Sequence, residues 1–399
     1  MGVVDRAHEV VVVGGGAVGV CTALSLAELG HDVGLFEANR IASGATGKSV
    51  GGIRQQFSDD LRTRLMMESR GIFSDYAAQS ERITVDEIGY LFLARTEAQA
   101  DALRRDFRRH GEMGLDTRLV EPESLTELVP SLRTDDLALG KHCPTDCVTD
   151  PYLVTTWLAE RAAEKGVTIY ENTAIRSLVS EGDRLTGVET DEGLVSAESV
   201  VVSAGISSNE LLDTVDVEMA MVPKRIHAAV TEEMNTKMDD QPFTVDLGTR
   251  MYFRPEGSRS LLIGGSVPQS MERATDGNTR HTPDFLPVVA EFMMERTVGF
   301  EDVGIRSSWA GWKGVTPDGL PFVGSVPRID GLFVATAFNG HGFMLAPVIG
   351  RELANRIATG AWGAFDLSRF SPARTVADGS SEEGAEETFM GVSNHTDDA

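Results

Sequence analysis

The chain has 399 residues, of which 41% are apolar, so it can bury a large core in two domains or one elaborate domain. Its 61 acidic residues outnumber the 36 basic ones and give a formal net charge of −25, which disfavours nucleic acid and anionic membranes as partners. Such an acidic surface with only six lysines is typical of proteins from salt-loving organisms, and we expect a halophilic surface here.

No apolar run reaches the roughly 18 residues that a membrane-spanning helix requires. The N-terminus leads directly into a strand-like segment without the pattern of a signal peptide, so we expect a cytoplasmic protein with no integral membrane segment. Three cysteines, Cys21, Cys143 and Cys147, are too few for a disulfide framework. His142 adjoins Cys143, but three soft ligands without a partner pair make no zinc motif, and we predict no metal site.

The first expected elements predict a dinucleotide-binding unit. They are a buried strand, a helix and a second strand, over 10–13, 18–29 and 32–36. The sequence GGGAVG joins the first strand to the helix, and its Gly14, Gly16 and Gly19 form a G-x-G-x-x-G motif. Glu37 follows about 20 residues later, where a carboxylate can accept hydrogen bonds from ribose hydroxyls. Together these features favour dinucleotide binding over a chance tight turn.

The middle of the chain alternates between helical and strand-like segments. Strands are expected over 83–96, 167–171 and 199–203, and helices over 97–111 and 152–165. Short β segments follow over 224–231, 251–254 and 260–264, and then a helix over 283–297. Because turn residues separate the short β segments, we expect them to form an antiparallel sheet in a separate domain.

Lys313 lies between Trp312 and a Thr-Pro-Asp-Gly turn in the segment WAGWKGVTPDGLPFVG. Turn geometry explains Pro317 and the two residues after it, but it does not explain the lysine.

The last structured segment, 331–358, begins as a strand, passes through the loop sequence NGHG and continues as a helix. Pro347 fits that helix only near its first turn. The loop either places a second helix N-terminus where it stabilises negative charge or is a plain strand-to-helix turn. From about Asp366 the sequence becomes acidic and almost free of apolar residues, which predicts a disordered tail.

Four segments in chain order resemble motifs of the FAD-dependent D-amino-acid oxidase superfamily. They are GGGAVG with Glu37, IASGATGKSVGGIRQQF, WAGWKGVTPDGLPFVG and GLFVATAFNGHGFMLAPVIG. The most similar branch contains the sarcosine oxidase β-subunit, glycine oxidase and proline dehydrogenase. The resemblance implies oxidation of an amine by hydride transfer from its Cα or N-methyl carbon to flavin N5, after which water hydrolyses the imine.

The resemblance also implies an α/β fold. In it, a discontinuous Rossmann-like FAD-binding domain supports an α+β substrate domain with an antiparallel sheet. We expect the FAD-binding domain to comprise residues 1–80, 145–218 and 300–362. The substrate domain then comprises 81–144 and 219–299, and residues 363–399 form the acidic tail.

Carried over to this sequence, the resemblance implies three groups of FAD-binding residues. The group at the pyrophosphate and adenosine comprises Gly14, Gly16, Ala17, Val18, Gly19, Glu37, Ala38, Ile175, Ala204 and Gly205. The group that runs over the flavin comprises Ser43, Ala45, Thr46, Lys48, Ser49 and Gly51. The group that faces the isoalloxazine comprises Gly340, His341, Gly342, Phe343 and Met344. Gly311 and Lys48 occupy the positions at which some relatives attach FAD through cysteine or histidine, so we predict noncovalent FAD.

The resemblance further implies a function for Lys313. Glycine oxidase-like relatives carry an arginine here that grips the substrate carboxylate, assisted by a tyrosine at the position of Tyr252. Lys313 keeps the charge without the bidentate geometry of arginine. Arg54 is the other cation expected near the flavin, and His341 is expected to donate a hydrogen bond rather than act as a base. The alternatives are a surface lysine at 313 and a loop-stabilising histidine at 341.

Three functions are compatible with these features. The first is oxidation of a small amino acid or secondary amine such as glycine, sarcosine, proline or a D-amino acid, with oxygen, a quinone or a protein as electron acceptor. The second is oxidation of a 2-hydroxy acid or polyol phosphate, which would need a cluster of further anion-binding residues. The third is a non-catalytic flavoprotein subunit that helps a partner subunit to assemble. Arg225 and Arg254 either reach a second carboxylate or form structural ion pairs.

Overall fold

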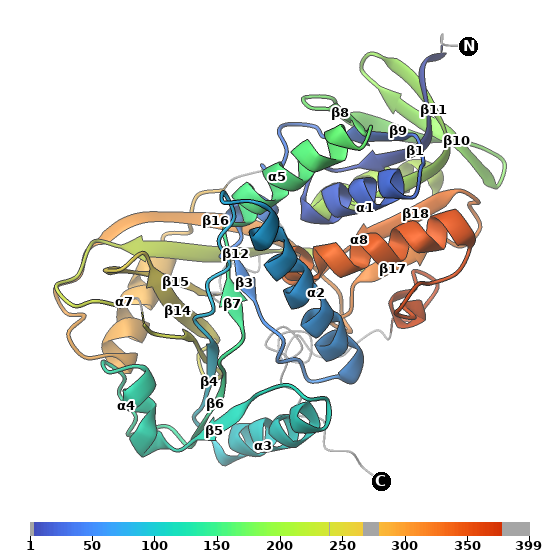
Figure 1. Ribbon diagram of the computed structural model, residues 1–399. Helices are drawn as coiled ribbons and strands as arrows, with labels where there is room; N and C mark the ends of the chain where they lie inside the picture. Colours follow the sequence, from blue (N-terminus) through green and yellow to red (C-terminus); the bar gives the residue numbers. More distant parts are fainter. Residues whose placement is uncertain (1–3, 239, 266–278, 377–399) are drawn as a thin grey trace.

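Strands of two different patterns separate into two eight-stranded sheets, which form the two lobes seen in Figure 1. The structure is a computed structural model, and it describes residues 4–238, 240–265 and 279–376. Continuously apolar strands pair mostly in parallel in one lobe, whereas the short strands of the middle of the chain form a largely antiparallel sheet in the other. The predicted α/β fold class is confirmed.

The first sheet has the order β17-β18-β11-β1-β2-β8, and β10 pairs with β11 and β9. Its strands are β1 (Val4–Val13), β2 (Val33–Phe36), β8 (Thr168–Tyr170), β9 (Ile175–Glu181), β10 (Arg184–Thr190), β11 (Gly193–Val202), β17 (Phe322–Ser325) and β18 (Leu332–Thr336). The central strand β1 runs parallel to β2 and β11. Its valines are buried on both sides: Val10 and Val12 face the helices, and Val11 and Val13 face the strands β9 and β10.

Four helices cover one side of the first sheet (Figure 1). They are α1 (Ala17–Glu28), α2 (Asp60–Gln79), α5 (Pro151–Glu164) and α8 (Gly342–Thr359). The helices α1 and α8 approach each other closely at Gly350, where an added Cβ would lie 2.6 Å from the carbonyl carbon of Cys21. The short helix α6 (Ser208–Leu212) packs on the other side of the sheet. The N-termini of α1 and α8 are thereby held in fixed positions at the ends of β1 and β18.

The second sheet has the order β16-β12-β15-β14-β13-β4-β6-β5, and all its neighbours are antiparallel except the parallel pair β13 and β4. Its strands are β4 (Tyr90–Ala94), β5 (Arg118–Val120), β6 (Leu139–Cys143), β12 (Val222–Thr231), β13 (Phe243–Asp246), β14 (Met251–Glu256), β15 (Ser260–Gly265) and β16 (Ile305–Val315). One side packs against α7 (Phe285–Arg296) and α4 (Leu125–Leu128). The other side faces α3 (Glu97–Glu112) and the segment around residue 50. A small sheet of β3 (Gly52–Ile53) and β7 (Cys147–Val148) lies between the lobes.

Two strand predictions need correction. Residues 300–362 were expected in the FAD-binding domain, but β16 pairs with β12 along its full length and therefore belongs to the second sheet. The strand expected over 83–96 is shorter, because only β4 is extended there and the residues before it form turns and bridges. Hydrophobic periodicity indicates that a strand exists, but it does not identify the partner of the strand.

Two further expectations near the C-terminus differ from the structure. Pro347 lies in the second turn of α8 rather than the first, and the helix continues through it. The tail was expected to be disordered from residue 363, but Leu367 and Phe370 are fully buried and the Arg374 guanidinium donates to Asp318 at 2.7 Å. Residues 363–376 therefore pack on the protein, and the rest of the predicted tail lies outside the described residues.

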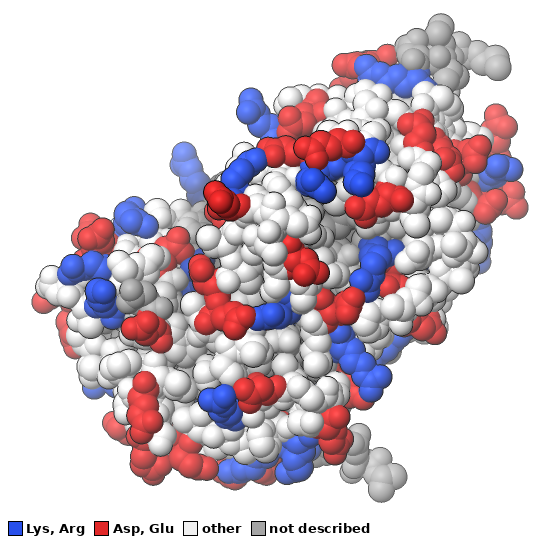
Figure 2. Space-filling view, in the orientation of Figure 1, with Lys and Arg blue, Asp and Glu red and all other residues white. Residues whose placement is uncertain are grey.

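Basic and acidic side chains adjoin one another over much of the face shown in Figure 2. Exposed pairs include Arg82 with Glu160 at 2.7 Å and Arg6 with Glu192 at 2.7 Å. Within the part of the chain that the structure describes, no helix is long and apolar enough to cross a membrane.

Candidate active site

The glycine motif forms the turn between β1 and α1. Gly14 has a φ of +110°, and a Cβ added there would lie 2.5 Å from the Ser203 carbonyl oxygen. A Cβ added to Gly19 would lie 1.9 Å from the Gly14 carbonyl oxygen, so both positions require glycine. At Gly16, the N-cap of α1, the nearest atom to an added Cβ is the Thr46 hydroxyl at 3.2 Å. Gly14 and Gly19 thus close the turn, whereas Gly16 leaves an open approach to the helix N-terminus.

The N-terminus of α1 suits a negatively charged group. Its first turn contains no acidic residue, and the N–H of Ala17 donates to the Thr46 hydroxyl at 3.0 Å. Val18 is 8% exposed, so its side chain belongs to the core and only its backbone faces the turn. The unpaired N–H groups at a helix start carry partial positive charge, which stabilises a phosphate or pyrophosphate.

Glu37 is fixed beside this turn by two backbone N–H groups. Its carboxylate accepts from Gly15 at 2.7 Å and from Asn39 at 2.8 Å, and it keeps further lone pairs for hydroxyl donors. The N–H of Thr173 donates to the Glu37 carbonyl oxygen at 2.9 Å, which brings the segment before Ile175 to the same place. The remaining residues predicted around the adenosine are Ala38, which follows Glu37, and Ala204 and Gly205, which follow β11 beside the glycine turn.

The segment 43–51 links the glycine turn to the second sheet. Thr46 contacts the first turn of α1, and the Trp309 indole N–H donates to the Lys48 carbonyl oxygen at 3.0 Å. A Cβ added to Gly311 would lie 2.9 Å from the Lys48 Cβ. The two positions considered for covalent attachment of FAD therefore adjoin each other. The other predicted members of this group, Ser43, Ala45, Ser49 and Gly51, lie along the same segment.

The second glycine-rich loop leads into α8, whose N-cap is His341 and whose first turn contains no acidic residue. Ala337, Asn339 and Gly340 have φ angles of 59°, 55° and 94°. A left-handed alanine is costly and persists only where the surrounding structure requires it, as in many functional loops. The N–H of Asn339 donates to the Gly314 carbonyl oxygen at 3.0 Å, so this loop is tied to the end of β16.

Two residues predicted to face the isoalloxazine contribute to the core instead. The Phe343 ring packs against Phe73, with ring centroids 5.2 Å apart, and Met344 packs against the same core. The Ser69 hydroxyl donates to the Met344 carbonyl oxygen at 2.5 Å.

One side of the second sheet faces the segment that contains Lys48. Alternate residues of a strand share a side, so Trp309 and Lys313 point the same way as Gly311, which contacts Lys48. We call this side of the sheet the inner face. The pairing of neighbouring strands shows which other residues lie on it. They are Trp309, Gly311 and Lys313 on β16, Lys224, Ile226 and Ala228 on β12, Leu262 and Gly264 on β15, and Tyr252 on β14. Lys313 is 9% exposed, which argues against a surface lysine.

Tyr252 lies flat over the inner face. A Cβ added to Gly264 on the neighbouring strand would lie 2.3 Å from the Tyr252 hydroxyl oxygen, so this hydroxyl is directed toward β12 and β16. Burial raises the pKa of Tyr252, which therefore remains a neutral donor at physiological pH. Tyr90 is arranged similarly, because its hydroxyl occupies the space beside Gly52 and its ring stacks on Phe243 at 4.1 Å.

Arg54 and His341 form a buried pair, 5% exposed each, between the inner face and α8. An Nη of Arg54 lies 3.2 Å from His341 Nε2, and because a guanidinium only donates, the histidine accepts at Nε2 and is neutral in this arrangement. The Arg54 guanidinium also lies 4.4 Å from the Phe57 ring centroid. Burial lowers the pKa of Arg54 to about 10, so it stays cationic at neutral pH.

Several supporting residues were not found from the sequence. The fully buried Asp146 accepts from Gln55 at 2.8 Å and from Gln56 at 2.9 Å, which holds the backbone on either side of these glutamines and thus Arg54. His110 donates to the Phe57 carbonyl oxygen at 2.9 Å. Asp146 and His110 lie far from Arg54 in the sequence and belong to no motif, so only knowledge of the three-dimensional contacts could have indicated them. Among the described residues, no group of three or more His, Cys, Asp or Glu could hold a metal ion.

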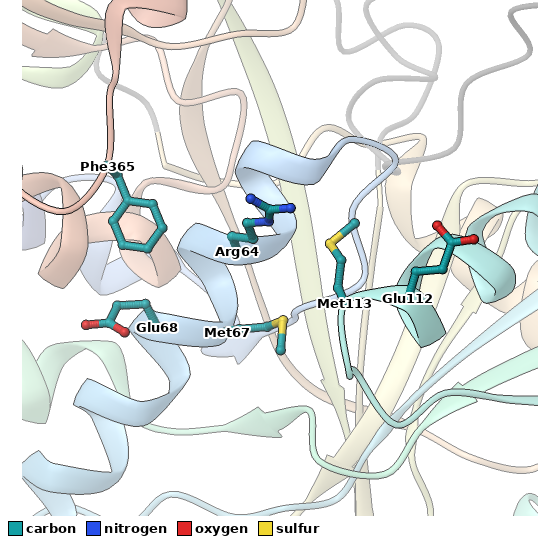
Figure 3. A pocket seen from close by; sticks show the side chains of 6 residues that line it. All are labelled: Arg64, Met67, Glu68, Glu112, Met113 and Phe365. Carbon is teal, nitrogen blue, oxygen red and sulfur yellow. The ribbon is translucent and has the colours of Figure 1, made fainter.

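A surface hollow of about 570 Å³ lies away from these residues. Figure 3 shows it between α2, the end of α3 and the segment after α8. It is lined by Arg64, Met67, Glu68, Glu112, Met113 and Phe365. No residue predicted for cofactor or substrate lines this hollow, so we assign it no part in the reaction.

The parallel sheet, the glycine turn and the fixed Glu37 carboxylate define a dinucleotide-binding protein. The model of the family DAO, described as FAD dependent oxidoreductase, matches residues 9–356. The chain belongs to this family, as the four motifs predicted.

Three relatives illustrate the match. Mouse mitochondrial sarcosine dehydrogenase is 28% identical over 382 residues, which cover 91% of this chain but 41% of the longer relative. Glycine oxidase from Geobacillus kaustophilus (strain HTA426) is 28% identical over 378 residues, or 92% of this chain and 97% of that protein. The structure of L-proline dehydrogenase from P. horikoshii has a TM-score of 0.86 at 27% identity and covers 92% of this chain and 97% of that one.

The residues present fit FAD, the cofactor of the family. Gly16 leaves room for a pyrophosphate at α1, and the Glu37 carboxylate can accept from a ribose. The N-terminus of α8 offers positive potential at the other end of the site. The glycine turn and the loop before α8 are joined to the second sheet by Lys48 and Gly314, respectively.

Proposed function

We propose that this chain oxidises a small amine that carries a carboxylate group. The position of Lys313 carries this proposal, because it places a cationic donor on the inner face, beside the segment that contains Lys48, where it can hydrogen-bond a carboxylate. The names of the three relatives, which refer to sarcosine, glycine and L-proline, support a substrate of this class.

The binding step follows from the charges on the inner face. Lys313 would hold the substrate carboxylate by a charge-assisted hydrogen bond, and the neutral Tyr252 hydroxyl would supply a second donor. Two donors on adjacent parts of a rigid sheet orient the substrate C–H bond, which is the main requirement of hydride transfer.

Arg54 and His341 would contribute orientation and polarity rather than a base. While Nε2 of His341 accepts from Arg54, that nitrogen cannot take up a proton. The amine must therefore enter neutral or lose its proton to solvent.

Bound FAD supplies a two-electron acceptor. The substrate C–H bond breaks and its electron pair leaves with the hydrogen as hydride, the amine nitrogen loses one proton to solvent, and a C=N bond forms. Water then adds to the imine carbon and gives a carbonyl compound and the free amine. An oxidant such as oxygen or a quinone must afterwards take two electrons from the cofactor.

We further propose that FAD is held noncovalently. Gly311 and Lys48 offer no thiol or imidazole at the two attachment positions. Burial raises the pKa of Cys21, Cys143 and Cys147 to about 12, so none of these thiols is a ready nucleophile.

An anaerobic visible spectrum tests the function. The purified protein, loaded with FAD in high salt, is mixed in turn with glycine, sarcosine, proline and D-alanine. We expect one of them to bleach the flavin band, and the speed of recolouring in air then separates an oxidase from a dehydrogenase. Bleaching only by a 2-hydroxy acid or glycerol phosphate would support the second function instead. A yellow protein that no substrate reduces would support the non-catalytic one.

A further inference from the structure

Lys141 is a buried lysine of β6 that contacts α3, and the binding step proposed above does not use it. It is 1% exposed, and its Nζ lies 3.4 Å from His110 Nδ1 and 3.9 Å from an Asp106 carboxylate oxygen. Both partners lie on α3. Burying an ammonium costs free energy even where it is paired. The proposed binding step therefore leaves a buried charge behind the candidate site unexplained.

The Lys141 ammonium fixes the proton of His110 on one ring nitrogen. An ammonium only donates hydrogen bonds, so His110 accepts at Nδ1 and carries its proton at Nε2. From Nε2 it donates to the Phe57 carbonyl oxygen at 2.9 Å. Arg109, also on α3, donates to the same oxygen. The helix α3 thus holds the backbone of Phe57 by two donors, one of which depends on Lys141.

Phe57 connects this layer to the Arg54–His341 pair. Its fully buried ring packs edge-on against the His341 ring, with centroids 4.9 Å apart, and lies 4.4 Å from the Arg54 guanidinium. An Nη of Arg54 also donates to the carbonyl oxygen of Gln56, the residue before Phe57, at 3.0 Å. Because a close-packed interior transmits small displacements, a shift of the Phe57 backbone moves both members of the pair.

The arginines considered from the sequence make different contacts. The Arg225 guanidinium lies 4.5 Å from the Trp312 ring centroid, on the side of the sheet opposite the inner face. Arg254 pairs with Glu256 at 2.7 Å, which is the structural alternative expected from the sequence. The contacts of Lys141, in contrast, lead to the candidate site.

We propose that Lys141 is a positioning residue for the Arg54–His341 pair and acts on it through His110 and Phe57. In this role Lys141 touches neither substrate nor cofactor. Its effect on His341 is a property of the fold, whereas the consequence for substrate binding rests on the proposed function.

A transition near pH 8 follows from this arrangement. Burial lowers the pKa of Lys141 from 10.5 to about 8, so the ammonium loses its proton as the pH rises through that value. The neutral amine has a lone pair and can also accept, so it no longer restricts His110 to one tautomer. Burial lowers the pKa of His110 to about 3 and that of Arg54 to about 10, so both titrate outside the range from pH 7 to pH 9. The charged and titratable groups that face Lys141 are Asp106, Arg109 and His110 on α3, Arg54 after β3 and Asp146 before β7.

Nuclear magnetic resonance of the histidine side chains tests the proposal. The FAD-loaded protein, labelled with ¹⁵N in its histidines, is titrated from pH 7 to pH 9, and His110→Gln and His341→Gln identify the two signals. We expect the ring nitrogens of both histidines to shift together, with a midpoint near pH 8. In Lys141→Met both signals should stay constant over this range and differ from their wild-type positions at pH 7. A constant His341 signal in the wild type, or the same His341 transition in Lys141→Met, would overturn the proposal.

Two further variants show that the charge at position 141 is responsible. Lys141→Arg keeps a cation over the whole range, so its His341 signal should remain near the wild-type position at pH 7. Lys165→Met makes the same substitution as Lys141→Met at the exposed end of α5 and should reproduce the wild-type transition. The wild-type titration needs no variant, so it tests the proposal even where a substitution at the buried position unfolds the protein.

A ligand titration separates this proposal from the proposed function. Methylthioacetate has one carboxylate and a sulfur in place of the amine nitrogen, so it does not titrate between pH 7 and pH 9. Its binding to the FAD-loaded protein is followed by the visible spectrum. We expect the wild type to bind it about 3 to 10 times more weakly at pH 9 than at pH 7, the effect of about one hydrogen bond, and Lys141→Met to bind it equally at both.

The possible failures differ in what they contradict. A His341 transition without any change in the affinity for methylthioacetate would overturn the positioning role of Lys141. If methylthioacetate leaves the flavin spectrum unchanged at every pH, the proposed function fails, and the His341 signals alone decide whether Lys141 positions the pair.

Discussion

At the scale of single residues, His110 shows how the fold controls protonation behind the candidate site. It is fully buried, its Nε2–H donates to the Phe57 carbonyl oxygen, and Lys141 Nζ lies 3.4 Å from its Nδ1. The Phe57 ring in turn packs against His341 with centroids 4.9 Å apart. A neutral His110 therefore holds the aromatic ring that supports the Arg54–His341 pair.

Acid should lower the stability of the fold, because His110 takes up a proton more readily in the unfolded chain. Burial, and then the nearby Lys141 charge, lower the pKa of His110 from 6.5 to about 3. Between these two pH values the unfolded chain binds the proton more tightly than the folded protein, so stability is lost as the pH falls below about 6.5. The variant His110→Gln keeps a donor for the Phe57 carbonyl but has no group that titrates. We expect the free energy of unfolding of the variant, relative to that of the wild type, to rise by about 1 to 2 kcal/mol when the pH is lowered from 7 to 5. Urea unfolding of both proteins at pH 7 and pH 5 measures these free energies. The same difference between variant and wild type at both pH values would contradict the prediction.

At the scale of the elements, two glycines of the turn before α1 serve different purposes: Gly19 is needed for folding and Gly16 for cofactor binding. An added Cβ at Gly19 collides with the Gly14 carbonyl oxygen, whereas at Gly16 it meets only the Thr46 hydroxyl. We expect Gly19→Ala to lower the melting temperature of the FAD-free protein. Gly16→Ala should fold normally but bind FAD about 10 times more weakly, because the methyl group occupies the approach to the helix N-terminus.

Melting curves without FAD and fluorescence titrations with FAD distinguish the two effects. Gly71→Ala is the matched control, because a Cβ there meets nothing within 4 Å and alanine favours the helix α2. A Gly16→Ala protein with undiminished FAD affinity would remove that position from the pyrophosphate site.

The sequence predicted most elements of the FAD-binding lobe because their patterns are local. Four valines in a row, three glycines at fixed spacing and one acid after the next strand need no long-range information. Register is different, since nothing near Lys224 in the sequence indicates that it opposes Lys313. The assignment of β16 to the wrong sheet has the same cause, because its pairing with β12 is a long-range contact. The tail boundary was missed because Leu367 and Phe370 are two buried residues in an otherwise acidic stretch.

At the scale of the whole molecule, the candidate site lies between two sheets that belong to different lobes (Figure 1). The first sheet presents two helix N-termini, and the second presents an inner face with lysines and a tyrosine. Cofactor and substrate would thus be held by different lobes, and the segment 43–57 with the loop before α8 joins them. This division explains why substitutions on the inner face should affect substrate binding without loss of FAD.

An anaerobic substrate titration of the Lys313→Met variant therefore tests the proposed site most directly. The fastest of the four amines in the bleaching test is titrated anaerobically against wild type, Lys313→Met, Lys313→Arg and Lys165→Met. We expect Lys313→Met to keep its FAD and melting temperature while the concentration for half-maximal reduction rate rises about 100-fold. Lys313→Arg should recover most of the affinity, and Lys165→Met should match the wild type. An unchanged concentration dependence in Lys313→Met would show that the carboxylate binds elsewhere.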